Sequence, residues 1–263
     1  MNRGDYLFKQ QIVHQEGENK QSKIVLWDFD SVLHWSLYSG YHEETGEKNP
    51  EYEEKDFDLV VAKLNETTYK VINEIEDKYK IQNLYIFVRG SGNFRKKLYP
   101  TYKSKRKDPH PLINKLYEYV KVAFNSISAD NCEAEDLCKT FHNKLNGSSL
   151  IVYVDHDLKE LPGLLLNYKT LEWEEIDKPN ALHNKYKKLV IGEGQEGANF
   201  TMGVGQKYWD EHFSVGMSIE DYEEAAYNAF LWSWSDKAKV GKKTIRTPNP
   251  EKATIKLIMK SLT

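Results

Sequence analysis

Apolar residues along this chain occur either in short unbroken runs or at helical spacing. Three runs, at 23–27, 83–88 and 149–154, predict buried β-strands. Between the first two, apolar residues from Phe57 to Tyr79 recur at helical spacing and predict a crossover helix. A strand, a helix and a strand in this order favour a parallel sheet. The pattern therefore predicts an α/β fold.

The rest of the chain is expected to be mostly helical. Residues 164–176 are typical of a β-hairpin with its turn near Asn167 to Thr170. Residues 1–22 and 40–55 are polar and aperiodic, which predicts a lead-in and an acidic loop. Helices are expected at 112–126, 133–145, 180–190, 206–213, 219–234 and 250–262.

Length and composition exclude several classes of protein. A chain of 263 residues with 40% hydrophobic residues can form one large α/β domain, or a core with an appendage, and is not globally disordered. Cys132 and Cys138 lack zinc-ligand spacing, so we expect buried or half-buried free thiols in a reducing compartment. Because the chain has neither an apolar stretch of membrane length nor an apolar signal core, we expect a cytoplasmic protein with no membrane partner.

The charge is unevenly distributed, although the formal net charge is only −3. Residues 43–58 are strongly acidic, and the tail from Lys237 to Lys260 is mostly basic. The block 95–107 holds seven basic residues and no acid, interleaved with tyrosines. An acidic run is usually a solvated face, but a basic run without acids and with interleaved tyrosines is less readily explained in that way.

Acidic residues follow two of the predicted strands and open a predicted helix. In a parallel sheet the carboxyl ends of the strands meet at one edge, where active sites gather. Clustered carboxylates repel one another unless a hard cation such as Mg²⁺ or Mn²⁺ binds between them, and a pair of such ions can promote phosphodiester cleavage. Any one such acid is more often a helix cap or a turn former, so the convergence of three groups carries the hypothesis. The groups are Asp28 with Asp30, Asp155 with Asp157, and Glu133 with Glu135 and Asp136.

One acidic pair also has a different interpretation. The segment IVLWDFDSVLH resembles the nucleophile motif of haloacid-dehalogenase-type phosphatases, with Asp28 as nucleophile and Asp30 as acid/base. Asp155 and Asp157 would then supply that family's later acidic pair. The basic block and the Gly-rich segment 192–205 have no role in such an enzyme, so this alternative ranks second.

Five segments, together spanning most of residues 24–207, resemble the bacteriophage and bacterial 5′-nuclease family of flap endonucleases, phage 5′-3′ exonucleases and phage RNase H, which has a PIN-like fold. The basic block is the most specific of them, because an acid-free FR…YPxYKxxR pattern is rare by chance. The five segments are DFDSVL (28–33), NFRKKLYPTYKSKR (93–106), EAED (133–136), DHDLKELPG (155–163) and the Gly-rich segment 192–207.

The resemblance implies a parallel-sheet nuclease core flanked by helices at 23–191, with a helical arch at about 90–111. It also implies a helical DNA-binding region at 192–263 that contains a helix–turn–helix clamp, in which the family also places a K⁺ ion. The implied activity is two-metal-ion hydrolysis of phosphodiesters at 5′ ends, flaps or nicks of DNA or RNA/DNA. A role in phage DNA replication, as a monomer beside replication proteins, follows from the resemblance alone.

The same resemblance assigns individual residues. Lys103 would contact the scissile phosphate with the help of Arg95 and Arg106, and Asp28 and Asp155 would be essential for catalysis. Two Mg²⁺ or Mn²⁺ ions would be bound by residues among Asp28, Asp30, Glu133, Glu135, Asp136, Asp155, Asp157, Glu193 and Glu196. Nucleic acid would be contacted by Arg95, Lys96, Lys97, Tyr99, Tyr102, Lys103, Lys105, Arg106, Gly203, Gly205 and Lys207.

The sequence also departs from the family pattern. Glu193 and Glu196 stand where the family has aspartates. Many relatives have an acid at the end of the second strand, where this chain has Val88 or Arg89, and Asp30 is the candidate to supply that carboxylate. These departures motivate a second hypothesis, a nuclease-like protein that binds branched DNA and cuts it weakly or not at all.

Overall fold

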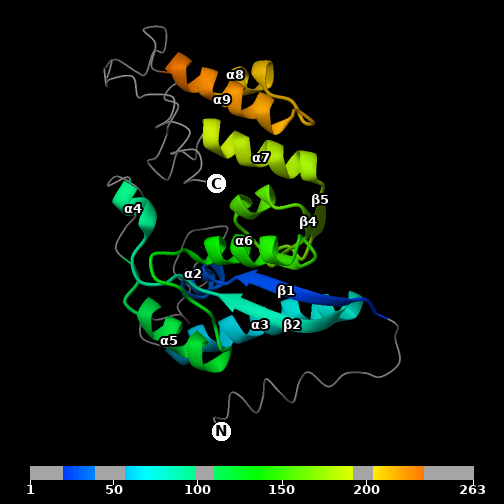
Figure 1. The fold of residues 1–263 in the computed structure, drawn as a ribbon. Coiled ribbons are helices and arrows are strands. Elements are labelled where there is room, and N and C mark those ends of the chain that lie inside the picture. Colours follow the sequence, from blue (N-terminus) through cyan, green and yellow to red (C-terminus); the bar gives the residue numbers. More distant parts are fainter. Residues whose placement is uncertain (1–19, 39–56, 99–102, 104–108, 192–203, 234–263) are drawn as a thin grey trace, which may run out of the picture. The chain divides into compact units, whose positions relative to one another are not determined.

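A five-stranded sheet with the order β2-β1-β3-β4-β5 forms the centre of the fold (Figure 1). The pairs β1–β2, β1–β3 and β3–β4 are parallel. The connection from β4 to β5 is too short for a crossover, so this last pair is a hairpin, and the Asn167 N–H donates to the Glu172 carbonyl oxygen at 3.0 Å. The strands are β1 (Ser22–Asp28), β2 (Lys80–Phe87), β3 (Leu150–Tyr153), β4 (Gly163–Asn167) and β5 (Trp173–Ile176).

The computed structural model describes residues 20–38, 57–98, 103, 109–191 and 204–233. These residues fall into two units. The first unit holds the sheet with the helices α2 (Asp30–Tyr38), α3 (Phe57–Lys78), α5 (Ile113–Ala123) and α6 (Ala134–Lys144). The second holds α4 (Phe94–Leu98), α7 (Lys178–Ile191), α8 (Gln206–His212) and α9 (Ile219–Ser233). The 3₁₀ helix η1 (His156–Glu160) and the strand β5 have residues in both units.

Side-chain alternation along β1 divides the core into two layers. Val25 and Trp27 point to one face, where they belong to a fully buried apolar cluster that includes residues of α2, α3 and α5. Leu26 and Asp28 therefore point to the opposite face. Phe87, the register partner of Asp28, packs on Phe141 of α6 at 4.9 Å between ring centroids. Helix α6 thus covers the face toward which Asp28 is directed (Figure 1).

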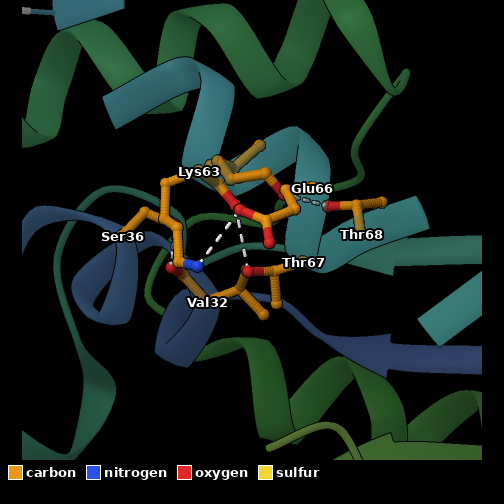
Figure 2. A network of polar contacts seen from close by, with 7 residues as sticks. Val32, Ser36, Lys63, Glu66, Thr67 and Thr68 are labelled. Carbon is orange, nitrogen blue, oxygen red and sulfur yellow. Dashed lines mark hydrogen bonds and ion pairs between the residues drawn. The ribbon is translucent and has the colours of Figure 1, made fainter. Parts of the chain in front are cut away.

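Two buried hydroxyl groups beside the apolar layer are satisfied inside their own helices. The buried Ser36 hydroxyl donates to the Val32 carbonyl oxygen at 2.9 Å, and the buried Thr68 hydroxyl donates to that of Leu64 at 2.7 Å. Figure 2 shows these contacts beside the ion pair and hydrogen bond around Lys63 on α3. Because each hydroxyl has a partner one turn earlier, α2 and α3 can be buried without the cost of an unpaired donor.

The structure confirms the three predicted strands, the hairpin and the helices predicted within the described residues. It adds α2, which the sequence did not predict, although Val32, Leu33 and Leu37 have helical spacing. It also pairs β4 with β3, so that the hairpin extends the sheet. The helix expected at 250–262 lies outside the described residues, and the domain boundary expected at 192 stays a prediction.

Two expectations from composition can also be compared with the structure. Cys132 is half-buried and Cys138 is buried, and both are free thiols, as expected. None of the helices within the described ranges has the length and apolar character needed to span a membrane.

Gly90, just beyond β2, lies against the backbone of the segment before α6. Its N–H donates to the Cys132 carbonyl oxygen at 3.0 Å, and a Cβ at this position would overlap the Ala129 carbonyl group. Gly90→Ala should therefore lower the free energy of unfolding by about 1–3 kcal/mol, as overpacking does elsewhere. The exposed Gln82→Ala on β2 should stay within about 0.5 kcal/mol in the same denaturant titration. Equal stability of the two variants would contradict the close packing.

The second unit has an apolar cluster of its own, in which helices α7, α8 and α9 meet. A chain of hydrogen bonds joins them. The Trp209 Nε1–H donates to His183 Nε2 at 3.2 Å, so the neutral imidazole carries its proton on Nδ1. Nδ1 then donates to the Tyr222 hydroxyl at 2.9 Å, which donates to the Ser214 carbonyl oxygen at 2.7 Å. A second proton on His183 would point at the Trp209 N–H and break this chain.

The network predicts a pH dependence of stability. Burial, with a smaller contribution from the charge of Lys187, lowers the pKa of His183 from its usual value near 6.5. The unfolded chain then binds this proton more tightly, so the stabilisation is complete above about pH 6.5 and is lost as the pH falls through the folded-state pKa. Melting temperatures between pH 7.5 and 5.5 should fall more steeply for the wild-type protein than for His183→Gln. Parallel curves would contradict the role of His183.

Candidate metal centre

Three carboxylates converge beyond the carboxyl ends of the central strands. One ligand atom from each of Glu135, Asp155 and Asp157 lies within 4.8 Å of the others. Glu135 lies in the first turn of α6, and Asp155 and Asp157 come just after β3. Glu135 and Asp157 are buried, whereas Asp155 is exposed, so the group is open on one side. This is the size of group that one hard cation can bridge.

The turn after β3 sets the positions of the two aspartates. The Asp157 N–H donates to Asp155 Oδ1 at 3.4 Å, and the Leu158 N–H donates to the Asp155 carbonyl oxygen at 3.4 Å. Leu158 is fully buried and anchors this 3₁₀ turn. On the α6 side, Lys139 Nζ lies 3.9 Å from a Glu135 carboxylate oxygen and offsets part of the negative charge. The backbone of the turn thus positions Asp155 and Asp157, and the ammonium group of Lys139 lies beside Glu135.

Asp28, the last residue of β1, faces the same group. Only 8% of its surface is exposed. Burial raises the pKa of Asp28 well above its usual value, and the negative charges of Asp30, Glu135 and Asp155 raise it further. The repulsion acts over short distances, so the residues from β1, from α6 and from the turn after β3 form a single acidic centre.

Asp30 is bound differently from the other acids. Its Oδ1 accepts hydrogen bonds from the Arg89 backbone N–H at 3.0 Å and from the Tyr117 hydroxyl at 3.2 Å. Burial raises the pKa of Asp30 to about 6, although both donors and the Arg89 charge act in the opposite direction. Asp30 is thus held at the carboxyl end of β2, next to the position where the sequence lacks an acid.

Glu133 and Asp136 form a capping box at the start of α6. The Asp136 Oδ2 accepts from the Glu133 N–H at 2.9 Å, which satisfies a donor at the helix terminus. The structure therefore brings Glu135 of this segment to the three-carboxylate group, whereas Asp136 is engaged in the cap. Sequence spacing could not separate these roles because capping acids and metal ligands occur in the same helix turn.

The predicted nucleic-acid contacts are only partly described. Arg95 is buried in α4, Lys96 of the same helix is exposed and Lys103 is half-buried; Lys97 also belongs to α4. Gly205 is the N-cap of α8, and Lys207 is exposed, 3.9 Å from Glu211. The remaining predicted residues lie outside the described part of the chain: Tyr99, Tyr102, Lys105, Arg106, Glu193, Glu196 and Gly203.

Two residues beside the centre were not assigned a role from the sequence. The Arg89 guanidinium carbon lies 5.0 Å from the centre of the Tyr117 ring, and both residues donate to Asp30. Arg89 follows a predicted strand, which could have drawn attention to it. Tyr117 has no signal in the sequence beyond its place in an amphipathic helix.

No family model and no curated protein matches the sequence. Among solved structures, the chain is similar to the catalytic core of Rad2 in complex with a DNA substrate. The identity is 12%, the match covers 92% of this chain and 88% of that chain, and the TM-score is 0.44.

Mutual repulsion within the acidic centre predicts a stabilising substitution. Because burial and like charges raise the pKa of Asp28, its charged form destabilises the fold, and this cost grows as the pH rises above the unfolded value near 4. In the presence of a chelator, Asp28→Asn should raise the melting temperature by roughly 2–4 °C, or about 1 kcal/mol in a chain of this size. The exposed Asp58→Asn should cause little change. A lower melting temperature for Asp28→Asn would contradict the repulsion.

Proposed function

We propose that this chain is a divalent-metal-dependent nuclease that hydrolyses phosphodiesters. The observation that supports the proposal most strongly is the convergence of Glu135, Asp155 and Asp157 at the carboxyl edge of a parallel sheet. Asp28 faces the same group from the neighbouring strand. Assembling buried carboxylates without a cation is unfavourable, so their presence together points to metal binding.

The donor set fits Mg²⁺ or Mn²⁺. All candidate ligands are carboxylate oxygens, which hard divalent cations prefer, and the exposed Asp155 leaves a side open to solvent and substrate. Bound there, the cation would lower the pKa of a water molecule and stabilise negative charge on a phosphate. The protein's contribution is to hold the ligands: β1 presents Asp28, the first turn of α6 presents Glu135, and the turn after β3 presents both aspartates.

Nucleic acid as the substrate is proposed from the basic block of the sequence. Residues 95–107 carry positive charge without acids, and within them we assign Lys103 and Arg95 to the scissile phosphate. Lys96, which is exposed on α4, would contact the phosphate backbone. The Gly205 N-cap and Lys207 of α8 are proposed as a second contact with duplex.

The kind of nucleic-acid substrate and the biological setting are proposed from the motifs that resemble the 5′-nuclease family. On that basis the substrates are 5′ flaps, nicked duplexes and RNA primers on DNA, and the setting is phage DNA replication. The motifs that support it are DFDSVL, the basic FR…YPxYKxxR segment, EAED and DHDLKELPG.

A weakly cutting protein that binds branched DNA is the second candidate. The observation that favours it is the positive Arg89 beside Asp30, at the strand end where a further acid would be expected. Binding of a flap duplex without cleavage in either Mg²⁺ or Mn²⁺ would support this candidate.

The decisive experiment is cleavage of an end-labelled 5′-flap duplex by the purified chain, with Mg²⁺ or Mn²⁺ and then with chelator. Asp155→Asn and Glu135→Gln should each lower the single-turnover rate at least about 100-fold while flap binding in chelator persists, because each removes a metal ligand. Asp58→Asn, an exposed acid on α3, is the matched control. Wild-type cleavage rates in both site variants would refute the centre, and turnover of a small phosphomonoester instead of the flap would favour the phosphatase alternative.

A further inference from the structure

Arg89 occupies a defined place at the edge of the acidic centre. β1 and β2 are parallel, and Asp28 is the register partner of Phe87. Asp30 lies two residues after Asp28, and Arg89 lies two residues after Phe87. Both are therefore found at the carboxyl end of their strand, next to each other. The Arg89 N–H donating to Asp30 Oδ1 at 3.0 Å links the two segments directly.

Tyr117 of α5 fixes this arrangement from a third element. Its hydroxyl donates at 3.2 Å to the same Asp30 oxygen that Arg89 uses. The Arg89 guanidinium carbon lies 5.0 Å from the centre of the Tyr117 ring, at cation–π distance. The backbone N–H of Arg89 thus binds Asp30, while the Arg89 side chain is held over the ring of Tyr117. Because the Tyr117 hydroxyl also binds Asp30, the guanidinium is kept close to the Asp30 carboxylate.

Asp28 and Asp30 are neighbours that repel each other, but they differ in their other partners. Asp28 also interacts with Glu135 and Asp155, which lie in the three-carboxylate group. Asp30 interacts with the charge of Arg89. A guanidinium stays protonated at any pH that proteins tolerate, so the Asp30 side of the centre always carries a fixed positive charge. A divalent cation placed there would meet that charge and would have to compete with two hydrogen-bond donors for Asp30 Oδ1.

We propose that Arg89, held over Tyr117, excludes a second divalent cation from the Asp30 side, so that this centre binds one metal ion and Asp30 is not a ligand. The inference rests on the proposed function, because it takes the three-carboxylate group to be a metal site. The role of Arg89 is electrostatic: its guanidinium permanently supplies the positive charge that a second ion would otherwise bring. A one-ion centre departs from the two-ion arrangement that the family resemblance implies.

The test is the number of Mn²⁺ ions bound per chain, measured from the electron paramagnetic resonance signal of free Mn²⁺ during titration of the full-length protein. The wild type should bind one ion. Arg89→Glu, which removes the positive charge and adds an acid, should bind two. In the Arg89→Glu background, Asp30→Asn should return the number to one, because the second ion needs the Asp30 carboxylate.

Matched variants separate a local effect from a general change of charge. Lys80→Glu makes the same change of charge at the opposite end of β2, where Lys80 is exposed, and should keep one ion. Asp30→Asn alone should also keep one ion, because the proposal does not count Asp30 among the ligands. Arg89→Met keeps an apolar stem over Tyr117 without the charge, and it should bind a second ion even if Arg89→Glu fails to fold.

The outcomes distinguish the two proposals. A wild-type protein that binds no Mn²⁺ would refute the metal centre and this inference with it. Two ions in the wild type, or one ion in both folded Arg89 variants, would overturn the role of Arg89 while leaving the metal-dependent function intact. A second ion in Lys80→Glu would show that net charge, and not position, decides the number, and would also overturn it.

Discussion

The constraint on which the structure depends is the mutual repulsion of carboxylates that an apolar core forces together. Asp28 ends a strand whose preceding residues, Val25, Leu26 and Trp27, are fully buried, so it cannot move away from its neighbours without disturbing the centre of the fold. Glu135 lies in the first turn of α6, a helix that packs on the same strand. The stability gained by burying the apolar residues holds charged groups in an arrangement that would be unfavourable by itself.

Strand order explains why this happens at one edge. From β1 the chain passes to β2 on one side and later to β3 on the other, which is a topological switch point. Parallel strands all present their carboxyl ends in the same direction, so Asp28, Arg89 and Asp155, although far apart in sequence, lie at the carboxyl ends of adjacent strands. The sheet determines where charges gather, and the residues that follow each strand determine their sign.

Acids that look alike in the sequence have different surroundings in the folded chain. Asp136 accepts from the N-terminal backbone of α6, Asp30 accepts from Arg89 and Tyr117, and Glu135 lies with two aspartates. Hydrogen-bond donors offset the charge of the first two, whereas the last group brings three carboxylates together, and Lys139 offsets part of their charge. The divalent chemistry we propose is therefore confined to part of the acidic centre.

The sequence by itself determined the α/β class, the three strands of the central sheet, most of the helices and the acids that could meet at the sheet edge. These follow from hydrophobic periodicity and from the direction of parallel strands, which are local or pairwise properties. Only the tertiary structure decided which acids converge, that α2 begins at Asp30, and that Arg89 and Tyr117 bind that residue. Such choices depend on contacts between residues far apart in the sequence, such as Tyr117 and Asp30 at 87 positions, and no periodicity along the chain encodes them.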